Sequence, residues 1–279
     1  MTLYLSVRAQ SVGGPVVDVH VVEADGTAPT LAFRPVSAAE TAALARGKDL
    51  LLAAHGFNVS LQNGVRSMAW LEQSLKPSGS ELFFGILWPG DFWLPVVNYP
   101  FEGGPAMDSG RRVARFCNQQ LGDAHSISLV SHSLGARVVL EALNTLAKPA
   151  RTVTVTAGAI NRDCLNTQYA AADRNALATS TLASKSDNVL KLAYPIGDLI
   201  ADLLHDDHTP FTRALGYAGP ASPIAPPVAP SQIPDKQGYG HGDYFPPAVA
   251  APQKAGGKWR KSAEFIAKAF RGQTQAWPP

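Results

Sequence analysis

A serine between small residues stands near the middle of the chain, in the run Ser131-His132-Ser133-Leu134-Gly135. Alternating apolar residues (125–130) precede this run, and a stretch rich in Ala, Leu and Val follows it up to residue 147. This order predicts a strand, a sharp turn and a helix, which is the setting of a nucleophile elbow. Such a turn exposes the serine hydroxyl beside the N-terminus of the helix, so Ser133 is the candidate nucleophile. The usual motif is Gly-x-Ser-x-Gly, and Ser131 here takes the place of the first glycine.

A serine hydroxyl needs a general base at neutral pH, and histidine, with an ordinary pKa near 6.5, suits this role. Four of the seven histidines have other expected positions: His20, His55, His125 and His132. His132 is the middle residue of the elbow and is expected to point away from the hydroxyl. Three histidines remain: His205, His208 and His241. His241 lies between glycines in a loop after the last predicted strand, from which it can reach the elbow, so it is the predicted base.

A third group must orient the base, and in this arrangement it lies between the serine and the histidine in the chain. We expect this carboxylate to follow a strand directly, at the carboxyl edge of the sheet. Asp187 meets that condition after the predicted strand 178–184, and Asp163 meets it less closely after the predicted strand 152–156. Asp187 would also be a plausible cap for a helix beginning at Asn188. Asp187 is therefore the predicted acid, and Asp163 is the alternative.

The tetrahedral intermediate of acyl transfer needs hydrogen-bond donors where its oxyanion forms. The backbone N–H of Leu134, directly after the serine, is one predicted donor. The other is the backbone N–H of Phe57, in the loop that follows the predicted buried strand 49–54. Gly56 allows the chain to turn tightly there, and His55 is expected to be a hydrogen-bonded core residue.

Short apolar runs alternate with helical periodicity along the whole chain, which predicts a mostly parallel sheet with helices on both faces and an antiparallel N-terminal edge. The predicted strands are 3–8, 17–22, 49–54, 81–88, 126–130, 152–156 and 178–184. The predicted helices are 37–46, 64–75, 108–121, 134–147, 164–174, 188–204 and one within 254–271. We expect a single domain spanning residues 1–279.

Two segments are expected to flank the active site. Residues 91–105 are rich in aromatic residues and proline, and their likeness to the apolar lining of ligand pockets makes Phe92, Trp93, Leu94 and Tyr99 candidate substrate-binding residues. A covering of the hydrophobic core is the alternative for this loop. Residues 219–236 include six prolines in 219–234 and predict an ordered, extended loop packed across the domain.

Composition excludes several other classes of protein. Of the 279 residues, 46% are hydrophobic and 16% charged, which predicts a globular fold, and a net charge of +2 gives no reason to expect nucleic-acid binding. The chain has only two cysteines, Cys117 and Cys164, which we expect to be buried thiols.

We expect no membrane span and, because no signal peptide is visible, a cytoplasmic location. His205-Asp206-Asp207-His208 lacks further ligands at standard spacing, so no metal and no cofactor are expected. The sequence leaves the oligomeric state open.

Four motifs occur in order along the chain: His55-Gly56-Phe57-Asn58-Val59-Ser60, Trp88-Pro89-Gly90, Ser131-His132-Ser133-Leu134-Gly135-Ala136 and Gly240-His241-Gly242-Asp243-Tyr244-Phe245. Together they resemble a bacterial lipase- or esterase-like branch of the α/β-hydrolase superfamily, formerly described as a domain of unknown function. The resemblance covers about residues 50–245.

This resemblance implies an α/β-hydrolase fold with a core of about eight strands. It also implies Ser133 as nucleophile, Asp187 as acid and His241 as base, acting on a small-molecule ester through an acyl-enzyme. Acyl transfer or amide hydrolysis by the same triad is one alternative, and a non-catalytic binding scaffold is another. Ser131 and the idiosyncratic segment 206–234 depart from the pattern, and the second departure leaves the substrate class open.

Overall fold

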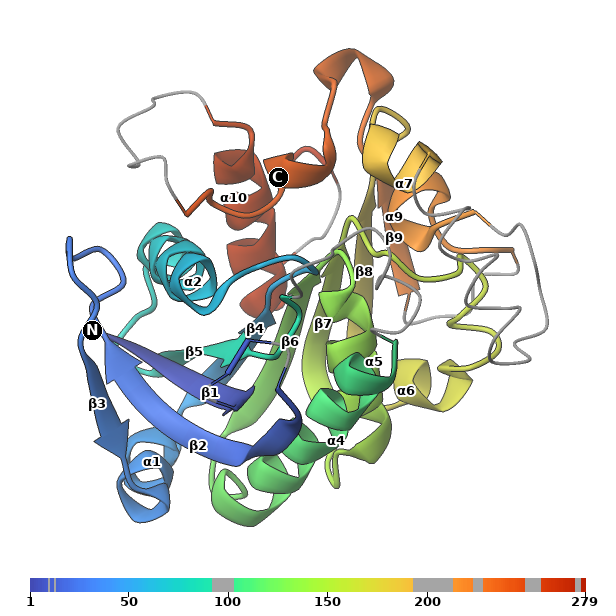
Figure 1. Cartoon of the computed structure of the whole chain (residues 1–279). Coiled ribbons are helices and arrows are strands. Elements are labelled where there is room, and N and C mark those ends of the chain that lie inside the picture. The colour runs from blue at the N-terminus through green and yellow to red at the C-terminus, as the bar shows by residue number, and fades with distance from the viewer. Residues whose placement is uncertain are drawn as a thin grey trace.

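The computed structural model describes residues 1–9, 11–12, 14–91, 103–192, 213–222, 228–248, 257–273 and 277–279. A nine-stranded sheet runs through this part of the chain in the order β3-β2-β1-β5-β4-β6-β7-β8-β9 (Figure 1). The strands are β1 (Thr2–Arg8), β2 (Val16–Ala24), β3 (Phe33–Val36), β4 (Asp49–Ala54), β5 (Glu81–Leu87), β6 (Ser126–His132), β7 (Ala150–Thr156), β8 (Ala176–Ala183) and β9 (Val228–Gln232). The pairings of β2 with β1 and with β3 are antiparallel, and the other pairings are parallel. The sheet is therefore mostly parallel, as predicted.

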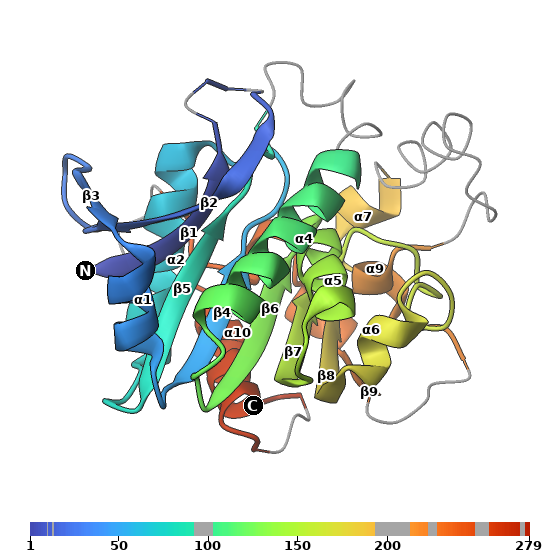
Figure 2. The same cartoon turned by 90° about the horizontal axis from the view of Figure 1, so that it is seen from below.

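Helices cover both faces of this sheet (Figures 1 and 2). The described helices are α1 (Ala38–Ala45), α2 (Leu61–Leu75), α4 (Gly103–Gln120), α5 (Gly135–Thr145), α6 (Ala170–Arg174), α7 (Asn188–Leu192), α9 (Leu215–Ala218) and α10 (Trp259–Phe270), with short 3-10 turns η2 (Asp235–Gln237) and η3 (His241–Asp243). Helices α2 and α10 contact each other on one face, and α4 and α5 pack together on the other. Among the described residues, no helix is both long and apolar enough to cross a bilayer.

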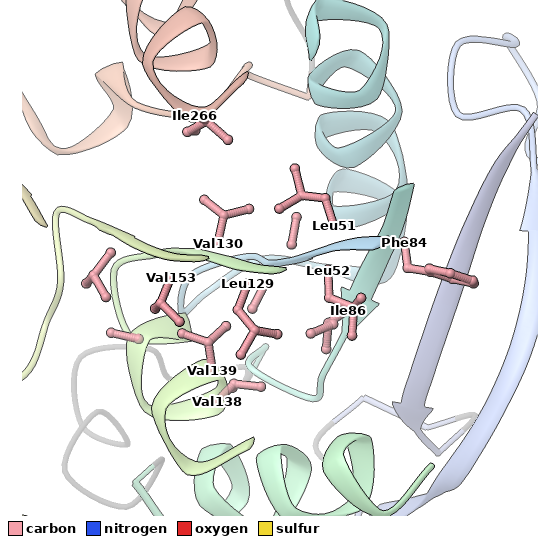
Figure 3. Packing of buried hydrophobic residues seen from close by; sticks show 14 of the residues in the cluster. Leu51, Leu52, Phe84, Ile86, Leu129, Val130, Val138, Val139, Val153 and Ile266 are labelled. Carbon is pink, nitrogen blue, oxygen red and sulfur yellow. The ribbon is translucent and has the colours of Figure 1, made fainter. Parts of the chain in front are cut away.

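The central strands are apolar on both sides because a helical layer covers each face of the sheet. Figure 3 shows Leu51 and Val130 pointing toward Ile266 of α10, whereas Leu52 and Leu129 point toward α5. All five of these side chains are buried. This two-sided burial explains why β4 reads as a continuous apolar run rather than as an alternating one.

The chain reverses its direction of winding at β4. This strand lies between β5 and β6 and is parallel to both. The connection to β5 passes through α2 on one face, and the connection from β5 to β6 passes through α4 on the other. In open α/β sheets, ligands bind at the carboxyl ends of the strands where the winding reverses. The loops after β4 and β6 therefore meet where a ligand site is expected.

The structure corrects several sequence predictions. The described part of the chain has nine strands, two more than the seven predicted ranges, because β3 and β9 were not predicted. Part of the expected extended loop 219–236 is β9, which pairs in parallel with β8. The antiparallel N-terminal edge is present as predicted, and it includes a further strand, β3, outside β2.

The structure also tests the predicted helices and the two cysteines, whereas most of the aromatic loop 91–105 lies outside the described residues. Helix α6 is shorter than predicted, and only the first turn of the predicted helix 188–204 lies in the described part of the chain. Cys117 and Cys164 are buried, as expected. The candidate substrate-binding residues Phe92, Trp93, Leu94 and Tyr99 lie outside the described residues, as do His205 and His208.

Candidate active site

Ser133 occupies the tight turn between β6 and α5. Its φ is 55°, in the left-handed region that residues with a side chain rarely adopt, at a cost of about 1–3 kcal/mol. Two backbone hydrogen bonds hold this conformation: the Ser133 N–H donates to the carbonyl of Thr156 at 3.0 Å, and the Ala136 N–H donates to the carbonyl of Ser133 at 3.0 Å. The turn thus has the strained geometry predicted for a nucleophile elbow.

Glycines let three backbone segments approach one another at this turn. A Cβ at Gly135 would lie 2.5 Å from the carbonyl oxygen of His55 and 2.9 Å from that of Ala54, so only glycine lets α5 begin against the end of β4. A Cβ at Gly56 would lie 2.9 Å from the Cβ of Ser133. The loop after β4 therefore packs directly against the candidate nucleophile.

The structure brings Ser133, His241 and Asp187 together in one hydrogen-bonded chain. His241 Nε2 lies 2.8 Å from Ser133 Oγ, and His241 Nδ1 lies 2.8 Å from Asp187 Oδ2. Because a carboxylate only accepts hydrogen bonds, Nδ1–H donates to Asp187 and Nε2 accepts from the serine hydroxyl. The arrangement places the candidate nucleophile, base and orienting group in contact, in the order that nucleophilic catalysis requires.

The carboxylate of Asp187 is completely buried and uses both of its oxygens. Oδ2 accepts from His241, and Oδ1 accepts the backbone N–H of Leu190 at 3.0 Å in the first turn of α7. Ser184 Oγ, just before this loop, donates to the carbonyl of Tyr239 at 2.9 Å and so ties the Asp187 loop to the His241 loop. Among the described residues, no hydrogen bond or ion pair joins Asp163, the alternative acid, to His241.

His132 holds the backbone beside the base, a contact that sequence reasoning did not anticipate. Its Nε2 lies 2.7 Å from the carbonyl oxygen of His241, and the two imidazole rings are 4.9 Å apart between centroids. Burial lowers the pKa of His132 to about 3, so the ring is neutral and its Nε2–H donates to that carbonyl. The ring also packs against Tyr244 and Phe245, which follow η3.

His55 is a core residue, as expected from the sequence. It is 2% exposed, its Nδ1 lies 2.8 Å from the carbonyl oxygen of Gly56, and its ring stacks on Trp88. Trp88 Nε1 in turn donates to the His55 carbonyl at 2.8 Å. Burial lowers the pKa of His55 to about 4, so this imidazole is neutral as well.

The two predicted oxyanion donors belong to two segments that meet at Ser133. Leu134 directly follows Ser133 and precedes α5, where the helix dipole gives partial positive charge. Within the part of the chain that the structure describes, no acceptor is bonded to the Leu134 N–H. Phe57 follows Gly56, whose backbone packs against Ser133.

The described residues hold no group of three or more His, Cys, Asp or Glu side chains suited to a metal ion.

Comparison with known families agrees with this fold. Residues 38–203, more than half of the chain, match the family described as "Alpha/beta hydrolase of unknown function (DUF900)". The chain belongs to this family. The family match includes Phe57, Ser133, Leu134 and Asp187, and it ends before His241.

Solved structures with a similar fold include three esterases, whereas no curated protein matches the chain. Esterase PE8 has 16% sequence identity and a TM-score of 0.45, covering 81% of this chain and 95% of that one. Inhibited esterase B from Lactobacillus rhamnosis has 10% identity and a TM-score of 0.45, covering 96% and 85%. An esterase of Pyrobaculum calidifontis has 13% identity and a TM-score of 0.41, covering 91% and 81%.

Proposed function

We propose that this protein is a serine hydrolase that cleaves carboxylic esters through an acyl-enzyme. The observation that carries the proposal is the unbroken hydrogen-bonded chain from Ser133 through His241 to Asp187. The left-handed backbone of Ser133 supports the same assignment, because strain of this kind is typical of an elbow nucleophile.

In the acylation step, Ser133 Oγ attacks the carbonyl carbon of the ester while His241 Nε2 accepts the hydroxyl proton. Asp187 keeps the proton of His241 on Nδ1 and stabilises the imidazolium that forms. The N–H groups of Leu134 and Phe57 are the proposed donors to the oxyanion of the tetrahedral intermediate. The intermediate collapses, the C–O bond to the alcohol breaks, and the leaving alkoxide takes the proton from His241.

In the deacylation step, water replaces the alcohol. His241 accepts a proton from the water as its oxygen attacks the acyl carbon, and a second tetrahedral intermediate forms. This intermediate releases the carboxylic acid, and Ser133 Oγ regains its proton from His241. One ester and one water thus give one acid and one alcohol, and the triad returns to its starting state.

A fluorophosphonate probe followed by peptide mass spectrometry tests this proposal. We expect one adduct, on Ser133, together with hydrolysis of 4-nitrophenyl acetate, butyrate or hexanoate. Ser133→Ala should lose both signals. Ser131→Ala is the matched control, because Ser131 is a buried serine two residues away that the mechanism does not use. A missing adduct would overturn the proposal and favour a non-catalytic binding scaffold, and an adduct on another residue would overturn the assignment of Ser133 as nucleophile.

A further inference from the structure

A cavity of about 600 Å³ lies at the same edge of the sheet as the triad, between the segments that follow β7 and β8. Its walls include Arg162, Lys185, Leu190, Lys191, Arg213 and Tyr217. Figure 1 shows α7 and α9, which supply part of this lining, side by side near the end of β8, and the two helices are in contact. Its volume is in the range of small-molecule sites.

Backbone hydrogen bonds connect two walls of the cavity to the residues of the triad. Leu190 lines the cavity, and its backbone N–H donates to Asp187 Oδ1 at 3.0 Å. Arg162 lies on the segment after β7, where the N–H of Ala159 donates to the carbonyl of Ser133 at 3.2 Å. Helix α7 also contacts η3, which carries His241. A substrate bound to the triad is therefore close to this cavity.

Backbone hydrogen bonds fix the wall formed by residues 213–219. The N–H groups of Arg162 and Leu215 donate to the carbonyls of Arg213 and Ile160, at 3.0 and 2.7 Å. Gly216 bonds to Gly158 on one side and accepts from the Ser184 N–H on the other, each at 2.9 Å. A Cβ at Gly216 would lie 2.2 Å from the backbone carbon of Ala157, so this segment lies flat against the end of β7. The cavity is thus a formed site on the sheet edge.

The cavity carries four cationic side chains without compensating charge among the described residues: Arg162, Lys185, Lys191 and Arg213. No carboxylate is among its described lining residues, and none of the four cations forms an ion pair within the described part of the chain. Among the described residues, Arg162 Nε is buried without an acceptor, and Arg162 Nη2 donates to the carbonyl of Pro220 at 3.2 Å. A buried donor without a partner is costly, and like charges around one cavity repel each other.

An anion in the cavity would give the buried Arg162 donor a partner and would offset the repulsion between the four cations. Guanidinium and ammonium groups form charge-assisted hydrogen bonds with carboxylate and phosphate oxygens. We propose that this cavity binds an anionic group of the substrate, so that the enzyme prefers esters whose acyl chain carries a terminal carboxylate or phosphate. The inference rests on the proposed esterase function and names the substrate class for that same active site.

A matched pair of substrates tests the preference: mono-4-nitrophenyl adipate, with a free carboxylate, and its neutral methyl ester of the same chain length. We expect kcat/KM to be about tenfold higher for the acid, and the ratio to fall as NaCl rises from 50 to 500 mM, because salt screens exposed charges. The double variant Lys185→Gln/Arg213→Gln should bring the ratio close to one. Lys261→Gln, an exposed lysine on α10, is the matched control and should leave the ratio unchanged. Hydrolysis of both esters at equal rates by the wild type would overturn the inference while the proposed function stands.

Direct binding separates failure of the inference from failure of the proposed function. Isothermal titration of the wild type with adipate and with phenyl phosphate measures occupancy of the cavity without turnover, and the tighter ligand identifies the preferred anion. We expect binding that weakens at least fivefold in Lys185→Gln/Arg213→Gln. If no ester is hydrolysed but this binding is found, the proposed function fails and the anion site stands. If neither ligand binds, the inference fails whatever the ester activity.

Discussion

At the scale of single residues, Asp187 contacts both the proposed base, His241, and the first turn of a helix. One carboxylate oxygen accepts from His241, and the other accepts the backbone N–H of Leu190 at the start of α7. A side chain bonded at both oxygens has little rotational freedom. The position and tautomer of His241 are therefore set by a group that is itself held by the backbone, which is the support that the proposed role of His241 as catalytic base requires.

Replacing Asp187 by asparagine separates these two tasks. An amide oxygen can still cap α7, whereas the amide NH₂ can only donate to His241 Nδ1 and so favours the tautomer with the proton on Nε2. That tautomer cannot accept the proton of Ser133, so we expect kcat for 4-nitrophenyl butyrate to fall by about 10³–10⁴-fold in Asp187→Asn with folding retained. Stopped-flow hydrolysis and circular dichroism measure the two quantities.

Asp163→Asn is the control for this prediction, because Asp163 also follows a strand but has no described contact with His241. We expect it to keep wild-type turnover. Full activity in Asp187→Asn combined with loss of activity in Asp163→Asn would move the orienting role to Asp163.

We propose that His132 is a positioning residue, which contacts the proposed base but not the substrate. Its neutral ring donates to the carbonyl of His241 and limits where the base can move. In His132→Leu we expect kcat to fall about tenfold with KM nearly unchanged, because a small misplacement of the base weakens proton transfer rather than substrate binding. His132→Gln retains a donor and should recover much of the kcat. A purely structural role would instead lower the fraction of folded protein and leave kcat per labelled Ser133 equal in both variants.

At the scale of elements, the two strands that sequence reasoning missed share one property. Strands β3 and β9 are the two edges of the sheet, and each contains a proline, Pro35 and Pro230. Proline has no N–H for a neighbouring strand, and in sheets it is confined largely to edges, so its presence argues against a central strand without excluding an edge one. The central strands β4 to β8 could be predicted because two-sided burial makes them continuous apolar runs or dense in β-branched residues.

The residues of the candidate site could be predicted from the sequence where they directly follow a predictable strand, and not where they depend on contacts between distant loops. Ser133 and Asp187 each follow a predicted strand closely, so the topology alone brings them to one edge of the sheet. The bond from His132 to the His241 carbonyl depends on how two loops more than a hundred residues apart meet, and no local pattern encodes it. The cationic cavity likewise joins residues from three separate segments.

The close contact between α5 and β4 makes Gly135 an element-scale constraint. In Gly135→Ala the added methyl group would meet two backbone carbonyls, which cannot rotate away as a side chain can. We expect a loss of about 1–3 kcal/mol in the free energy of unfolding, together with slower labelling of Ser133. Urea unfolding and fluorophosphonate labelling measure these effects.

Gly104→Ala is the matched control, since a Cβ at this position in α4 would meet no atom within 4 Å. We expect it to be neutral or to stabilise the helix by about 0.5–1 kcal/mol. Equal stability of the two variants would show that the elbow relaxes without cost.

At the scale of the whole molecule, two neutral histidines lie beneath the candidate active site: His55, which is buried, and His132, which is half-buried. Burial lowers the pKa of His55 to about 4 and that of His132 to about 3. The nine strands of the described residues belong to one sheet, which supports the proposal that residues 1–279 form one domain. Protonation of either ring therefore bears on the stability of this domain as a whole. In the unfolded chain the same imidazoles take up protons near pH 6.5.

This difference in proton binding predicts how stability depends on pH. Between about pH 6.5 and pH 4 the unfolded state binds protons at His55 and His132 and the folded state does not, so the free energy of unfolding falls as the pH falls. Each histidine contributes a slope of up to about 1.4 kcal/mol per pH unit in this window. Urea unfolding at intervals from pH 7 to pH 5 measures the slope. We expect His55→Gln to reduce it by about half and His20→Gln, at an exposed position, to leave it unchanged. An unchanged slope in His55→Gln would mean that the folded protein admits a proton at His55 as readily as the unfolded chain does.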